Sequence, residues 1–149
     1  MATYYFRNTG NTSWGVSTNW SLTSGGGATG AVPTATDTAN IDANSGACNM
    51  NISGVCAVLN CTGYTNTLTL TNGLTVSGNI TLATGMTISG SGTITINAAG
   101  TITTNAITIP NLTTLVNGGI LTFADNCKDR KSTRLNSSHR SLSRMPSSA

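Results

Sequence analysis

The sequence predicts an all-β fold: a single-stranded parallel β-helix, or β-solenoid, for which a right-handed coil is favoured. Three observations support this prediction. Apolar residues alternate with threonines over 65–109, glycine or asparagine interrupts the alternation at nearly constant intervals, and large aromatic residues are concentrated before residue 42. Alternation with a period of two places apolar side chains on one face of a strand and threonines on the other. Regular interruption of such strands is typical of coils that stack along an axis.

The segment 1–41 is expected to form an aromatic N-terminal cap together with the strands that lead into the coils. It holds five of the seven aromatic residues. Large rings over the first coil would cover apolar surface that has no preceding coil to pack against. Trp14 and Trp20 therefore have two possible roles. We favour packing within the cap; the alternative is that exposed rings stack on a glycan.

Short motifs in this region resemble a recurring N-terminal signature of β-helical proteins. The matching residues are Trp14, Gly15, Asn19, Trp20, Ser21, Pro33, Thr34, Asp37, Ala39 and Ile41. The pattern resembles that of virion-appendage and microbial surface proteins, and the likeness extends over residues 4–126. It implies an N-terminal cap followed by threonine-rich coils, and an N-terminal fragment of such a protein.

The segment 42–126 is expected to form the coils of the solenoid. Apolar pairs that flank a single threonine recur every six residues at first and less regularly afterwards. Three such units per turn predict about 18 residues per coil, a rise of about 4.8 Å and roughly four or five coils. The residues expected to form the buried core ladder are Leu68, Leu70, Leu74, Val76, Ile80, Leu82, Met86, Ile88, Ile94 and Ile96.

Two carboxylates near the start of the coils allow two interpretations. Asp37 and Asp42 could join backbone carbonyl oxygens in a Ca²⁺ site. Aspartate is also common in turns, where its carboxylate accepts hydrogen bonds from nearby N–H groups. We favour the turn interpretation, and we expect no metal, no cofactor and no catalytic residue.

Three cysteines, Cys48, Cys56 and Cys61, lie in the first part of the coil region. Their spacings of eight and five residues differ from the close Cys-x-x-Cys pairs of zinc sites. We expect them to be small buried residues that stack in the core. A disulfide among the three is the alternative, and the sequence leaves its connectivity open.

Charge is sparse and unevenly placed. Charged residues make up 7% of the chain, and the formal net charge is +3. Up to residue 128, however, two basic residues face three acidic ones, a net charge of −1, so we expect no nucleic-acid partner. No apolar run approaches the roughly 18 residues of a membrane span, and the first residues lack the pattern of a secretory signal. We therefore expect no membrane partner and synthesis without a visible signal peptide.

From residue 129 the composition changes to a basic, serine-rich string without alternation. The segments 129–139 and 143–149 match, in order, the translated constant blocks of an adapter used in short-read DNA sequencing, and residues 140–142 span the barcode between them. We therefore expect 127–149 to be a disordered, artefactual tail in which the adapter translation begins at residue 129. The natural protein is expected to continue differently beyond residue 128.

These features favour a non-catalytic structural or adhesive module. The setting we favour is a phage tail fibre, spike or other virion appendage, so the chain would be located in a virion or on an extracellular surface. A cell-surface glycan or receptor is the expected partner. A homotrimer would suit a fibre.

Three alternatives stay open: the N-terminal part of a polysaccharide-degrading β-helix enzyme, a bacterial surface adhesin, and an ice-binding solenoid. Glycoside hydrolysis generally needs a pair of carboxylates, and Asp37, Asp42 and Asp125 are scattered along the chain. Outward threonines suggest an ice-binding array. We expect the drift of their spacing from six to eight residues to spoil the flatness of such an array.

Overall fold

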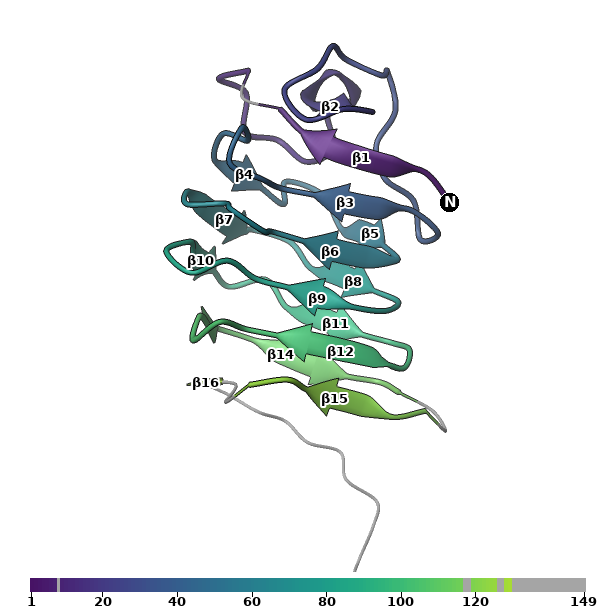
Figure 1. Cartoon of the computed structure of the whole chain (residues 1–149), viewed down its shortest axis with the longest axis vertical. Coiled ribbons are helices and arrows are strands. Elements are labelled where there is room, and N and C mark those ends of the chain that lie inside the picture. Colours follow the sequence, from purple (N-terminus) through teal and green to yellow (C-terminus); the bar gives the residue numbers. More distant parts are fainter. Residues whose placement is uncertain (8, 117–118, 126–127, 130–149) are drawn as a thin grey trace, which may run out of the picture.

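The computed structural model describes residues 1–7, 9–116, 119–125 and 128–129. The described residues form an elongated all-β solenoid of four full coils and part of a fifth (Figure 1), which confirms the predicted fold class. Among these residues the only helical segment is the three-residue 3₁₀ turn η1 (Ser17–Asn19). No helix in this part of the chain has the length and apolarity that a membrane crossing requires.

Three sheets run along the rod, and each full coil contributes a strand to each side. Sheet A contains β2 (Trp20–Ser21), β1 (Thr3–Phe6), β3 (Thr38–Asn40), β6 (Val58–Asn60), β9 (Ile80–Thr81), β12 (Gly100–Thr103) and β15 (Leu121–Phe123). Sheet B contains β4 (Cys48–Asn49), β7 (Thr67–Leu70) and β10 (Thr87–Gly90). Beside it β13 (Thr108–Ile109), which contacts β10, pairs with β16 (Lys128–Asp129) in a separate two-stranded sheet. Sheet C contains β5 (Gly54–Cys56), β8 (Leu74–Val76), β11 (Ile94–Ile96) and β14 (Leu112–Thr114). Within these sheets the strands pair in parallel, except for β1 with β2.

Most coils are longer than the repeat spacing predicted. In sheet A, Leu59 pairs with Ile80 and Ile80 pairs with Ile102, and both steps exceed the expected coil length. The step from Ile94 to Leu112 in sheet C does match it. The prediction was wrong for most coils because it counted Met86 and Ile88 as one more six-residue unit. Met86 instead closes the corner turn with Ala83, and Ile88 is the residue that pairs with Leu68.

The differences in coil length fall at the corners, so the strands stay in register. Thr75 pairs with Thr95, and Thr95 pairs with Thr113, although the first of these steps along the chain is longer than the second. The drifting spacing therefore does not disturb the register of these threonines, and its expected effect on the flatness of the array stays a prediction. The corners absorb the drift, and the threonines remain stacked above one another.

The inside of the coils is a continuous apolar core. Eight of the ten expected ladder residues are 0% exposed, and Met86 and Ile88 are 3% and 7% exposed. The side chains stack from coil to coil, as Leu68 does on Ile88. Burying an aliphatic side chain of this size contributes about 1.5–3 kcal/mol. This burial is the main force that holds the coils together.

A tight turn recurs at the corner between sheets A and B. The turns span 42–45, 61–64, 83–86 and 104–107, and in each the N–H of the last residue donates to the C=O of the first at 2.9–3.2 Å. In the last three turns the third residue, Gly63, Gly85 or Ala106, has a positive φ of 79°, 92° or 65°. This conformation favours glycine, so the fourth coil departs from the pattern.

Aromatic rings close the N-terminal end of the core. Phe6, Trp14 and Trp20 are 1%, 1% and 0% exposed. The ring of Trp20 lies edge-to-face against both of the others, with centroid distances of 5.2 Å to Phe6 and 4.6 Å to Trp14. Its indole N–H donates to the C=O of Trp14 at 2.8 Å. Both tryptophans pack in the cap, and the glycan-stacking interpretation is wrong because neither ring has an exposed face.

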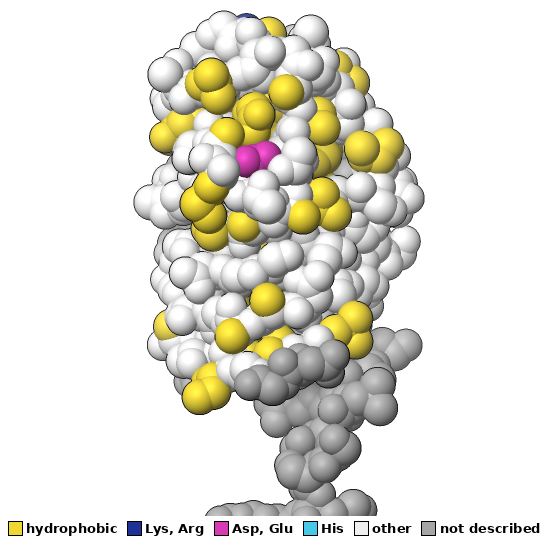
Figure 2. Space-filling view, turned by 90° about the vertical axis from the view of Figure 1, so that its right-hand side faces the viewer, with side chains coloured by type: hydrophobic (Ala, Val, Ile, Leu, Met, Phe, Trp, Pro, Cys, Tyr) yellow, Lys and Arg dark blue, Asp and Glu magenta, His cyan; other side chains and the backbone are white. Residues whose placement is uncertain are grey.

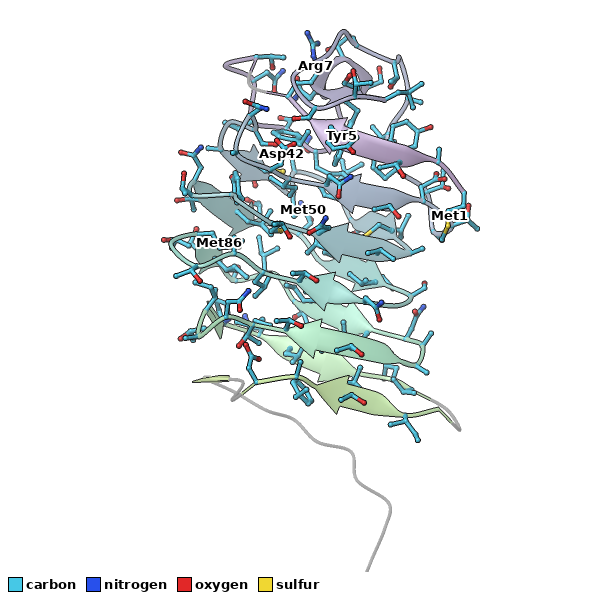
Figure 3. All side chains as sticks on the ribbon, viewed as in Figure 1. Met1, Tyr5, Arg7, Asp42, Met50 and Met86 are labelled. Atoms are coloured by element: carbon cyan, nitrogen blue, oxygen red, sulfur yellow. The ribbon has the colours of Figure 1, made fainter. Side chains whose placement is uncertain are left out.

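Hydrogen bonds fasten the loops of the cap around these rings. Nε of Arg7, labelled in Figure 3, donates to the C=O of Gly26 at 2.8 Å, and its Nη1 donates to the C=O of Thr18 at 2.6 Å. The buried Asn19 donates from Nδ2 to the C=O of Ser13 at 2.8 Å. The cap is therefore held by contacts between its own segments as well as by its packing on the first coil.

The expected tail, 127–149, falls mostly outside the described residues. Within it Lys128 and Asp129 form β16 in parallel with β13. Strand structure is therefore present at these two residues of the expected tail, and the rest of the range lies outside the described residues.

Candidate functional surface

Asp37 is a hydrogen-bond acceptor that joins the first strand to the first coil. Its Oδ1 accepts from the N–H of Ala2 at 2.6 Å, and its Oδ2 accepts from the N–H and the hydroxyl of Thr34 at 3.0 and 2.6 Å. The Thr34 hydroxyl, followed by the Ala2 N–H, lowers the pKa of Asp37 below its ordinary value of 3.8. The carboxylate is thus held in its charged form by the turn around it.

The other two carboxylates of the coils are used in the same way. Oδ1 of Asp42 accepts from the N–H of Asn44 at 2.9 Å. Oδ1 of Asp125 accepts from the N–H and the hydroxyl of Thr104 at 2.9 and 3.0 Å, and these bonds, led by that from the N–H, lower its pKa. The turn interpretation therefore describes both Asp37 and Asp42. Nowhere in the described ranges do three or more His, Cys, Asp or Glu side chains lie where they could hold a metal ion.

The three cysteines are free buried thiols, as expected, but they do not stack on one another. Cys48 pairs with Leu68 in sheet B, and Cys56 pairs with Val76 in sheet C, so their spacing places them on different sides of the coil. Burial raises the pKa of Cys48 well above 9.0 and those of Cys56 and Cys61 to about 12. A thiol that stays protonated is neither a nucleophile nor a metal ligand. Their role is packing.

The outer side of sheet A, which we call face A, carries two columns of uncharged side chains. In one column strand pairing stacks Thr3, Thr38 and Val58, and also Thr101 and Thr122. Between these two groups lies Asn79, the residue before β9, whose Oδ1 accepts from the N–H of Thr101 at 2.8 Å. The second column contains Tyr5, Asn40, Asn60, Thr81 and Thr103. Except for the buried Asn40, these residues are exposed or half-buried. Face A points toward the viewer in Figure 1, and Tyr5 marks its top row in Figure 3.

The other two sheets carry shorter columns of the same kind. On sheet B the column contains Ser13, Asn49, Thr69 and Ser89, and the hydroxyls of Thr69 and Ser89 lie 3.3 Å apart. On sheet C it contains Val55, Thr75, Thr95 and Thr113. Figure 2, which views the rod from the right-hand side of Figure 1, shows hydrophobic groups among uncharged polar and backbone atoms, an acidic side chain at one place and a basic one at the top edge. The sides of the rod are therefore largely uncharged.

A shallow depression of about 330 Å³ lies at the corner between sheets A and B. Its lining consists of Thr62, Gly63, Thr65, Leu82, Ala83, Thr84 and Asn105. Nδ2 of Asn105 donates to the C=O of Leu82 at 2.6 Å, so part of the lining already holds neighbouring coils together. The lining offers hydroxyl, amide and methyl groups but no carboxylate, imidazole, thiol or amine.

Reasoning from the sequence found the outward threonines but missed the asparagines that share their columns. Asn40 and Asn60 pair directly in sheet A. Each precedes a buried residue, Ile41 or Cys61, close to a corner turn. The turns 42–45 and 61–64 are offset by one residue relative to the paired strands, so aligning the turns alone does not bring Asn40 and Asn60 into register.

The fold and its outer surface define this chain as a parallel β-solenoid with an aromatic cap and uncharged polar sides. Comparisons with protein-family models, with curated proteins and with solved structures found no match. The class therefore rests on the order and register of the strands.

Proposed function

We propose that this chain is a non-catalytic structural module that forms part of the shaft of a virion appendage, such as a phage tail fibre or spike. The observation that carries the proposal is the in-register stacking of three sheets around one apolar core beneath an aromatic cap. Bending such a rod would break hydrogen bonds in one sheet or compress side chains behind another. A stiff rod holds an attached part at a fixed distance and orientation.

In this proposal any adhesive contact uses the uncharged sides of the rod rather than the cap tryptophans. Trp14 and Trp20 are buried and offer no ring face to a sugar. The threonine and asparagine columns offer hydroxyl and amide groups, which suit a cell-surface glycan or a polar receptor surface.

The uninterrupted gene with its neighbours provides the test. Capsid and tail genes beside it support the virion shaft. A sortase or autotransporter signal encoded downstream would assign the chain to a bacterial surface adhesin instead, and a downstream polysaccharide-degrading domain would assign it to an enzyme.

A further inference from the structure

Face A has two spacings that the backbone fixes. Successive rows belong to hydrogen-bonded strands, which lie about 4.8 Å apart, and the two columns are two residues apart along each strand, or about 6.6 Å. The grid extends over the six strands β1, β3, β6, β9, β12 and β15, whose arrows run side by side in Figure 1. Its geometry is therefore set by the coil register rather than by flexible side chains.

The side chains of the grid are uncharged, and most of them can form hydrogen bonds. Seven of its eleven side chains carry a hydroxyl, three carry an amide, one is valine and none is charged. At its centre Thr81 and Thr103 lie in adjacent rows of one column, and Thr101 shares a row with Thr103. Each hydroxyl both donates and accepts hydrogen bonds, and the β-branched threonines have few accessible rotamers.

A grid of this kind suits a partner that is itself flat, uncharged and periodic. A small soluble ligand would need a concave site, and the depression described above lies at a corner rather than on this face. A charged polymer would need complementary charge, which these columns lack. The surface of ice is a periodic array of oxygen atoms that donate and accept hydrogen bonds.

We propose that face A binds the surface of ice crystals, with Thr81, Thr101 and Thr103 at the centre of the contact. Individual contacts between a hydroxyl and ice are weak. A rigid array makes many of them at once, with little loss of side-chain entropy on binding. This activity goes beyond the structural role proposed above and does not depend on it.

The test compares two double variants of the full 149-residue chain. Thr81→Lys with Thr103→Lys places two long charged side chains on face A, and Thr75→Lys with Thr95→Lys places them on adjacent rows of sheet C. All four threonines are half-buried, so the two variants are matched. Thermal hysteresis and inhibition of ice recrystallisation are measured, and circular dichroism melting checks that each protein is folded.

The parent chain is expected to open a gap between the melting and freezing points. The face A variant is expected to lose this gap, and the sheet C variant to keep it. The proposal is overturned if the folded parent chain shows no gap, if both variants lose it equally, or if the chain is retained by crystalline cellulose but not by ice. If a lysine pair lowers the unfolding temperature of the protein, two single variants give the same comparison: Thr103→Arg on face A and Thr95→Arg on sheet C as its control.

Discussion

Ala106 occupies the third position of the corner turn in the fourth coil, where the second and third coils have glycine. Its φ is 65°, and that of Asn105 before it is 48°. A turn with positive φ at both central residues prefers Asn-Gly, and a left-handed conformation costs a residue with a Cβ about 1–2 kcal/mol. We predict that Ala106→Gly raises the free energy of unfolding by about 0.5–1 kcal/mol once the entropy of glycine is counted. Urea denaturation measures the change.

The reverse substitution provides the control. Gly85 has a φ of 92°, and a Cβ added there would meet no other heavy atom within 4 Å. A loss of stability in Gly85→Ala can therefore come only from the backbone, and we expect about 1 kcal/mol. A neutral Gly85→Ala would show that these turns tolerate a side chain, and the reasoning for Ala106 would then fail.

Asp37 makes stability depend on pH at the acid end. Because hydrogen bonds from Thr34 and Ala2 lower its pKa in the folded state, its contribution is complete above the ordinary value of 3.8. It is lost as the pH falls through the lower folded-state pKa. We predict that Asp37→Asn destabilises the chain at neutral pH and flattens the acid side of the stability curve below the ordinary pKa of 3.8.

Thr34→Val tests which hydrogen bond causes the effect. It removes the hydroxyl donor, the largest cause of the shift, and leaves the two N–H donors in place. Acid unfolding should then begin at a higher pH than in the parent chain. An unchanged acid midpoint in both variants would exclude Asp37 as the group responsible. Asp125, whose pKa is also lowered, would be examined next.

Among the elements, the cap can be loosened without removing its aromatic rings. Arg7 reaches two carbonyl groups in separate loops, those of Gly26 and Thr18. We predict that Arg7→Ala costs about 1 kcal/mol and speeds hydrogen exchange at the N–H of Thr29, which donates to Trp20. Exchange in β8 and β11 should not change. Arg7→Lys keeps the charge but not the forked geometry, so it should behave like Arg7→Ala. Rescue by lysine would show that charge alone is needed.

The strands could be predicted from the sequence, and the corners could not. Alternation alone identified the buried pairs, such as Leu74 with Val76, because a period of two leaves one face of a strand apolar. The corners follow from turn geometry and from close approach between coils. A Cβ at Gly100, for example, would lie 2.6 Å from the C=O of Gly78. Such a contact depends on which residues lie one coil apart. The repeat spacing underestimated the number of residues in most coils, so it could not identify these contacts.

The same cause explains why face A was missed, because Asn60 and Thr81 become neighbours only when the coil is longer than predicted. The stacking expected of the three cysteines failed for another reason. Alternation shows that a side chain faces the core but not which sheet its strand joins, and Cys48 and Cys56 lie on different sheets. Coil length, more than strand position, determines which side chains share a face.

For the whole molecule, the proposed roles depend on one structural property. A shaft needs strands that stack in parallel around the axis, and a periodic face needs the same strands in register. Short strands joined by short turns could also form an antiparallel meander, in which neighbours in sequence would pair. The two arrangements bury similar apolar residues and differ in which residues meet.

Inter-strand nuclear Overhauser contacts in the isotope-labelled chain test this property most directly. The solenoid predicts contacts between residues one coil apart, such as Leu74 with Ile94 and Ile80 with Ile102. Backbone contacts instead between strands adjacent in sequence, such as those between the Hα protons of Leu74 and Leu82, would show a meander and contradict the parallel rod.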